Sequence, residues 1–443
     1  MDRYRVSTLA ALAALLAAPA AAQVPVPLTP RALGMGNGYV AAARGSESLW
    51  LNPANLGLPG TTHWSFTIPA VAAGADILGL GVGDVRDIIK YDDQSDARKE
   101  EILASIPETG TDVRAEVRVP LVSAQIRHFA VGVSYNTLGS HTLQKDFVDL
   151  LLFGFQPLQR GIPSIQPLQT QGFRASYVDV AAAYGRRIPL TGVVGALTAG
   201  ATVHWYHGSG ITRTGIVDVD TVRNGLGVPT DVQVTYAGVK DEGGGGLGLD
   251  LGAAYQPMPN LTFSASVTNL VNSFDFGGDR TLRTVTLTSA DYNNGDIQGP
   301  IDRFDASKTA YNEATASAAV RALATDLGQE MELPRTMRVG AAYEPRPGTL
   351  LSAGYTDNLS TSRVAGMWDQ SLGLGVQQRL AFLSARVGVA SNFDSGTLLS
   401  GGLSLGPLHL GVARVTDGSV EGFDRSGWVA TFGLGTASRT TMP

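Results

Sequence analysis

The stretch that decides the fold is Ala196–Tyr206, which reads Ala-Leu-Thr-Ala-Gly-Ala-Thr-Val-His-Trp-Tyr. In an extended chain, successive side chains point to opposite faces, so this stretch separates apolar residues from small or polar ones. Such alternation is typical of a strand that lies between two different environments. The apolar face holds Leu197, Ala199, Ala201, Val203 and Trp205, and the other face holds Thr198, Gly200, Thr202, His204 and Tyr206.

The same alternation recurs along most of the chain, and the links between the alternating stretches are short and long in turn. This pattern gives roughly fourteen strands, an even number, as single-chain outer-membrane barrels need. We therefore predict an all-β fold, an antiparallel transmembrane β-barrel over residues 61–435, with a polar tail over 436–443. The expected short turns are 127–128, 186–192, 257–260, 344–348, 378–379 and 406–407; the expected long links are 73–111, 138–172, 207–246 and 272–334, with shorter outer loops near 358–366, 392–396 and 416–425.

Two segments of the long links favour helices. Residues 96–106 and 307–327 contain no Gly or Pro and are rich in residues that favour helices. We expect small helices in the outer loops, although the first could instead enter the lumen.

The large aromatic residues test this topology, because Trp and Tyr of a membrane barrel gather at the two interfaces. A secreted β-sandwich or solenoid is the alternative, and it gives no reason for such sorting. The outer interface is expected to hold Trp205, Trp368 and Trp428, and the interface beside the short turns Tyr184, Tyr255 and Tyr343.

The N-terminus and the composition place the protein outside the cytoplasm. Arg3 and Arg5 precede an apolar run that closes in three alanines at 20–22, which predicts a signal peptide over 1–22 and a mature chain from Gln23. The chain has no cysteine, so thiol chemistry is excluded. A formal net charge of −6 offers no basic surface for nucleic acid.

The most distinctive motif lies in the first part of the mature chain. It contains Gly34-Met35-Gly36-Asn37-Gly38 and, further on, Asn52-Pro53-Ala54. A nucleotide-binding glycine loop would have to follow a buried strand and begin a helix, and this motif follows a Pro-rich leader instead. Gly accepts close backbone approach, and Asn before Pro favours a turn, so a compact segment is expected, with a disordered leader as the alternative.

These two motifs resemble those of the FadL/PorV superfamily of outer-membrane barrels, and most closely its PorV-like and TraF-like uncharacterised members. The resemblance implies that residues 23–60 form a hatch inside the barrel lumen. It further implies that Gly34, Met35, Gly36, Asn37, Gly38, Asn52, Pro53 and Ala54 position or gate this hatch.

Charged and polar residues of the lumen face carry no evident catalytic arrangement. We predict that His204, Asp250, Arg338 and Arg386 line the lumen. His204 and His207 would face opposite sides of a strand, which disfavours a metal pair. No Ser, His and carboxylate set can be assembled from the sequence, so we expect no enzyme activity, no metal and no cofactor.

The function expected from the resemblance is transport of hydrophobic or amphipathic small molecules across the outer membrane of a diderm bacterium. The apolar run 150–155 in an outer loop is interpreted as an apolar patch where such molecules first bind. The alternative is a PorV-like scaffold for secreted or secretion-system proteins. Neighbouring genes for secretion or for hydrocarbon catabolism would discriminate between the two; outer-membrane lipid is a partner in both cases.

Overall fold

The structure is a computed structural model that describes residues 29–60, 62–78, 84, 94–189, 191–192, 194–275, 277–293, 298–329, 333, 335–359, 370–393, 396–420 and 423–437. The expected signal peptide, the expected mature start at Gln23, Trp368 and most of the polar tail lie outside these residues.

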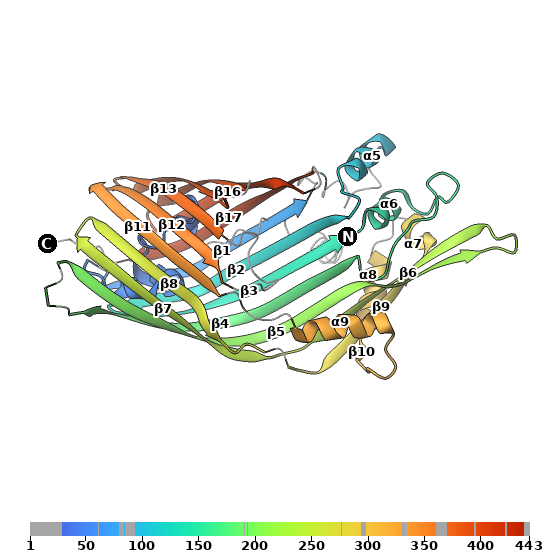
Figure 1. The fold of residues 1–443 in the computed structure, drawn as a ribbon, viewed down its shortest axis with the longest axis horizontal. Coiled ribbons are helices and arrows are strands. Elements are labelled where there is room, and N and C mark those ends of the chain that lie inside the picture. Colours follow the sequence, from blue (N-terminus) through green and yellow to red (C-terminus); the bar gives the residue numbers. More distant parts are fainter. Residues whose placement is uncertain are drawn as a thin grey trace, which may run out of the picture.

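Fourteen strands form a closed antiparallel barrel, as the alternation predicts (Figure 1). Each strand pairs with the next one around the wall, and β17 pairs with β1 to close it, for example through Ser65 and Ala437. The strands of the barrel are β1 (Trp64–Leu78), β2 (Thr111–Ile126), β3 (Phe129–Leu143), β4 (Gln171–Ile188), β5 (Ala196–Arg223), β7 (Gly245–Met258), β8 (Leu261–Asn272), β11 (Thr336–Arg346), β12 (Thr349–Asn358), β13 (Gln370–Leu380), β14 (Leu383–Ser391), β15 (Thr397–Leu405), β16 (Leu408–Val420) and β17 (Phe423–Ala437).

The two faces of the wall have opposite character. On β5, Val203 and Trp205 are 54% and 58% exposed on the outside, whereas Thr202 and His204 on the lumen face are buried. A broad outward apolar surface of this kind needs lipid around it, since soluble proteins do not expose one of this size. The β-sandwich alternative is therefore wrong, and the protein is a barrel of the bacterial outer membrane. Trp428, Tyr184 and Tyr343 also lie exposed on the outer face.

The two ends of the barrel differ, and we call them the short-turn end and the long-loop end. Outer-membrane barrels place short turns in the periplasm and long loops outside. One short turn lies three residues later than expected: β13 continues to Leu380, and the turn is made at 381–382, where Ala381 adopts a left-handed φ of 53°.

The long-loop end carries a folded layer rather than open loops (Figure 1). The second half of β5 leaves the barrel and pairs with β6, which pairs with β9. The link expected at 207–246 is thus mostly strand, because β5 continues to Arg223 and β6 pairs back along it. The added elements are α5 (Asp96–Ala104), α6 (Lys145–Phe153), β6 (Pro229–Asp241), β9 (Arg280–Leu287), α7 (Ser289–Asn293), α8 (Gln298–Ala306), β10 (Thr309–Ala310) and α9 (Ala318–Gln329).

Two sequence expectations need correction in this layer. The helix expected over 307–327 begins only at Ala318, because the Ser317 hydroxyl accepts the Val320 N–H and caps the helix there. The apolar run 150–155 is not an exposed patch: Leu150, Leu152 and Phe155 are buried in a cluster with Ile102 of α5. That cluster also holds α5 against α6 at the long-loop end. No described helix has the length and apolar character to cross a membrane.

Candidate functional site: the segment inside the lumen

Residues 29–60, which we call the lumen segment, lie inside the barrel near its short-turn end, in blue in Figure 1. The segment contains four short helices, and nearly all of its residues are buried although it has no strand. Its first helix is capped by Thr29, whose hydroxyl accepts the Ala32 N–H at 3.1 Å. The helices are α2 (Pro30–Gly34), η1 (Gly45–Glu47), α3 (Ser48–Leu51) and η2 (Pro53–Gly57).

Asn52 fixes the lumen segment to the wall. Its Oδ1 accepts the Ala54 N–H at 2.9 Å, which holds the turn before Pro53. Its Nδ2 donates to the carbonyl oxygens of Ala253 on β7 and Ala265 on β8, both at 3.1 Å. The Asn-Pro-Ala motif therefore makes a turn and also ties that turn to two neighbouring strands.

The Gly-Met-Gly-Asn-Gly motif places its backbone directly against the opposite side of the wall. Gly36 and Asn37 adopt left-handed φ values of 59° and 62°, a conformation that Gly and Asn tolerate best. The Gly36 N–H donates to Ser400 Oγ on β15 at 3.2 Å. Met35 is completely buried.

Glycines of the wall accommodate this segment. A Cβ added to any of them would lie within 3.2 Å of an atom of the lumen segment, so a side chain there would collide with it. They occur on ten strands, from β3 to β5, on β7, and from β11 to β16. We call this set the glycine belt: Gly132, Gly185, Gly200, Gly252, Gly340, Gly354, Gly373, Gly375, Gly388, Gly402 and Gly411.

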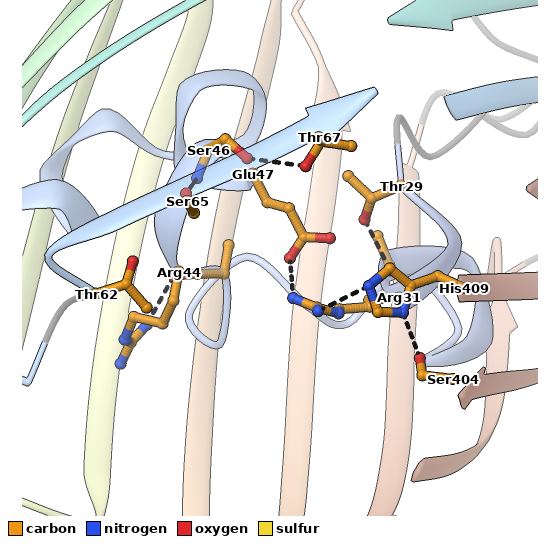
Figure 2. A network of polar contacts seen from close by, with 12 residues as sticks. Thr29, Arg31, Arg44, Ser46, Glu47, Thr62, Ser65, Thr67, Ser404 and His409 are labelled. Carbon is orange, nitrogen blue, oxygen red and sulfur yellow. Dashed lines mark hydrogen bonds and ion pairs between the residues drawn. The ribbon is translucent and has the colours of Figure 1, made fainter. Parts of the chain in front are cut away.

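The sector formed by β17, β1 and β2 is different. There the lumen segment reaches the wall through polar side chains: the Ser46 N–H donates to Ser65 Oγ at 2.7 Å, and Ser46 Oγ lies 3.0 Å from Thr67 Oγ1 (Figure 2). Gln125 of β2 accepts from Thr62 and Ser65. Side chains rather than backbone therefore fill the space between segment and wall in this sector.

An ion pair within the lumen segment lies in the same region (Figure 2). Arg31 Nη1 lies 3.2 Å from Glu47 Oε2, and Arg31 Nη2 lies 3.1 Å from His409 Nε2 of β16. Because a guanidinium only donates, Nε2 accepts and Nδ1 carries the proton, which it donates to Ser404 Oγ at 2.7 Å. Glu47 raises the pKa of Arg31, although burial lowers it.

Arg386, which the sequence places in the lumen, joins this network. Its Nη1 donates to Ser404 Oγ and its Nε to Gln377 Oε1, both at 2.7 Å. Arg386 and Arg31 are thus connected through Ser404 and His409, and only Arg31 pairs directly with Glu47. Burial also raises the pKa of Tyr39 and lowers that of Arg44, both in the lumen segment.

A second charged cluster joins two other residues that the sequence places in the lumen. His204 Nδ1 lies 3.0 Å from Asp179 Oδ1, and Nε2 lies 3.0 Å from Asp250 Oδ2, a charge contact not aligned as a hydrogen bond. Asp250 Oδ1 also accepts the Asn269 N–H at 2.7 Å. The ring of Trp50 in the lumen segment lies 6.5 Å from that of His204.

Aromatic rings continue from this cluster toward the long-loop end. Tyr206 stacks on His204 with ring centroids 5.6 Å apart and contacts Tyr177 and Phe274 at 5.9 and 5.5 Å. Arg338 contacts the Thr268 hydroxyl at 3.4 Å and interacts electrostatically with Asp250 of the second cluster. In the part of the chain that the structure describes, no group of three or more His, Asp or Glu is placed to hold a metal ion.

Sequence reasoning missed Arg31, Glu47, His409 and the glycine belt. A signal for the belt exists in the alternation itself, because its glycines occupy lumen positions of successive strands. The interfacial aromatics do not gather into a site; Tyr255 donates its hydroxyl to the Val194 carbonyl at 2.7 Å.

The chain is similar to one described protein family and to several solved structures. Residues 55–417 match the family described as "Family of unknown function (DUF5723)". A comparison with curated proteins finds no match. Similar solved structures include the toluene transporter TbuX of Ralstonia pickettii, at 16% identity over 93% of this chain and 99% of that one, with a TM-score of 0.47.

Two other similar structures are the monoaromatic hydrocarbon channel CymD and a FadL homologue of Pseudomonas aeruginosa. CymD is 15% identical over 93% of this chain and 98% of its own, with a TM-score of 0.48. The FadL homologue is 12% identical over 94% of this chain and 99% of its own, with a TM-score of 0.44.

Proposed function

The chain belongs to the DUF5723 family, a family of unknown function, and we propose from its own geometry that it carries hydrophobic small molecules across the outer membrane and releases them sideways into lipid. The lumen segment acts as a hatch that closes the barrel to water and ions. The observation that carries the proposal is the contrast between the glycine belt and the β17–β1–β2 sector.

The glycine belt argues against a water-filled pore. Gly36 and Met35 contact the wall backbone at Gly388 and Gly375, and Pro53 contacts Gly185 and Gly200. Contacts between backbones leave no room for water or for a solute to pass. A general diffusion porin, by contrast, keeps a polar, water-filled interior.

The wall itself is irregular in the β17–β1–β2 sector. The ladder between β1 and β2 runs from Trp64↔Ile126 to Thr67↔Ser123 and resumes at Ala72↔Arg118. Pro69 of β1 and Pro120 of β2 lie in the interval, and neither has an N–H to donate to a neighbouring strand. Pairing is also shifted between β1 and β17 and between β2 and β3 at this level.

The interruption in pairing faces lipid, and we infer that it is the weakest part of the wall. Ile68 of β1 and Leu121 of β2 both lie in the interval and are 43% and 45% exposed on the outer face. A molecule that leaves here enters the bilayer and does not have to cross water, which favours cargo that partitions into hydrocarbon. The aromatic rings from Phe274 to Trp50 offer such cargo an apolar approach from the long-loop end.

Deletion of residues 23–60 tests the hatch. The barrel strands close without this segment, so we expect the deleted protein to remain heat-modifiable on a gel and to conduct ions in a planar bilayer, where the intact protein conducts little. The intact protein should in addition increase the uptake of a labelled apolar probe into cells that lack it. An intact protein that is already fully open, or one that leaves probe uptake unchanged, would contradict the proposal.

A scaffold for secreted proteins is the second candidate. The folded layer at the long-loop end favours it, because Leu158 and Leu226 are 93% and 89% exposed there and offer contacts to a protein. Crosslinking in intact cells separates the two functions. A secreted protein captured through Leu158 or Leu226, together with unchanged probe uptake, would favour the scaffold.

A further inference from the structure

The short-turn end of the barrel carries a ring of arginines that neither proposed function uses. We call it the arginine rim. Among the described residues of the short turns and the adjoining strand ends, the only carboxylate is Glu344, and it accepts the Gly348 N–H at 2.9 Å. The rim consists of Arg127, Arg186, Arg187, Arg346 and Arg379.

These arginines are exposed and have no acidic partner. Within the described part of the chain, none of the five lies in an ion pair; Arg187 donates to the Gly195 carbonyl at 2.9 Å and Arg346 to Thr349 Oγ1 at 3.1 Å. The guanidinium groups of Arg127, Arg186 and Arg379 make no hydrogen bond to any described residue. Positive charge is therefore concentrated at one end of a chain whose formal net charge is −6.

The long-loop end shows the opposite arrangement. Arg160 there bonds Glu100 and Asp149, both at 2.6 Å, and Arg280 bonds Asp241 at 2.7 Å. These two cations are neutralised within the protein, whereas Arg223 and Arg321 at the same end bond only carbonyl oxygens among the described residues. What distinguishes the short-turn end is the near absence of carboxylates: among its described residues only Glu344 is acidic, whereas Glu100, Asp149 and Asp241 lie among the cations of the long-loop end.

The level of the arginine rim relative to the membrane indicates which chemical groups surround it. Ile126 and Phe129, which flank Arg127, are 67% and 62% exposed on the outer face, and Phe129 packs on Tyr184 with ring centroids 4.6 Å apart. Exposed aromatic and aliphatic side chains of this kind mark the edge of the hydrocarbon. Arg127 and Arg186 lie one or two residues beyond that edge, at the level of the lipid headgroups, which long basic side chains reach by extending along the interface.

We propose that the arginine rim binds the phosphate groups of anionic phospholipids in the periplasmic leaflet of the outer membrane. A guanidinium presents two parallel N–H donors that match two phosphate oxygens. Lipid phosphate supplies the negative charge that the protein itself lacks at this end. The inference is independent of what the barrel transports.

Native mass spectrometry of the folded chain in mild detergent tests the proposal. The probes are phosphatidylglycerol, phosphatidylcholine and inorganic phosphate, each titrated separately. The test variant is Arg127→Gln, Arg186→Gln and Arg379→Gln combined. The matched control is Arg174→Gln, Arg223→Gln and Arg321→Gln combined, which removes the same charge from exposed positions toward the long-loop end that lie in no ion pair among the described residues.

We expect the wild type and the control to bind phosphatidylglycerol more tightly than phosphatidylcholine or inorganic phosphate. The test variant should bind phosphatidylglycerol roughly tenfold more weakly. Wild-type binding should also weaken as salt is raised, a measurement that needs no variant to fold. Equal losses in test variant and control, no preference over phosphatidylcholine, or no dependence on salt would overturn the proposal; the rim would then face an acidic periplasmic protein instead.

Discussion

The lumen segment meets two kinds of wall, and they hold it in different ways. At most positions of the glycine belt, backbone lies on backbone, as where Gly36 contacts Gly388. At β17, β1 and β2, contact is made through the side chains of Ser46, Ser65 and Thr67. Close packing without voids resists displacement, because the backbone of the wall cannot move aside without breaking the strand ladder. Side chains can change rotamer, so the same segment is rigidly seated on one side and adjustable on the other.

The largest effect is expected from a side chain placed in the belt. Gly388→Val should prevent the lumen segment from seating, because its Cβ would collide with the backbone at Met35 and Gly36, which cannot rotate away. Overpacking a core costs about 1–3 kcal/mol where side chains can adjust, and we expect about 3 kcal/mol or more here. Ion conductance should rise, and trypsin should cleave at Arg31 or Arg44.

Gly401→Val provides the matched control on the neighbouring strand. The nearest atom to its added Cβ is the Arg386 carbonyl oxygen at 3.9 Å, so valine fits and improves the strand propensity. If Gly388→Val and Gly401→Val both stay closed to ions and resist trypsin equally, the glycine belt does not hold the lumen segment in place. The distinction between the belt and the β17–β1–β2 sector would then be wrong.

A smaller effect is expected from repairing the irregular wall. Replacing Pro69 and Pro120 together by valine restores two N–H donors, so the ladder between β1 and β2 can run without interruption. The barrel should unfold at a higher temperature on a gel, while uptake of an apolar probe falls severalfold. Pro257→Val, at the short-turn end of β7, is the control. Unchanged uptake in the double variant would place the exit elsewhere.

The sequence predicts the wall better than it predicts what fills it. Alternation needs only neighbouring residues, so the outward placement of Val203 and Trp205 follows directly and is confirmed. The seat of the lumen segment depends instead on partners far apart in the chain: Asn52 bonds Ala265, more than two hundred residues later. No local pattern encodes such a pairing.

At Thr202, this limit changes the predicted effect of a substitution. From alternation alone, Ala201→Arg is expected to be more harmful than Thr202→Arg, because arginine on the lipid face costs about 2–4 kcal/mol and a polar lumen tolerates it. Thr202 is fully buried, and its hydroxyl lies 3.4 Å from the Leu49 carbonyl oxygen. Arginine there would displace the lumen segment, so we now expect both substitutions to be harmful.

The smallest effect is expected from Glu47→Gln, which removes a charge at the adjustable side and leaves the belt intact. Arg31 would then lie near His409 and Arg386 without its carboxylate partner. The Arg31 side chain is 30% exposed, so water screens the loss, and we expect about 1 kcal/mol of destabilisation. Conductance should rise only slightly, with brief openings that prefer anions because Arg31 is uncompensated.

Arg31→Gln should give openings that prefer cations instead, since Glu47 then remains alone. The double variant should lose both preferences, and its destabilisation should be smaller than the sum of the two single effects, as expected for groups in direct contact. Single-channel recordings in a planar bilayer measure both the size of the openings and their ion preference. If the two single variants open equally and without opposite preferences, ions do not pass beside this pair, and the adjustable side of the lumen segment lies elsewhere on the wall.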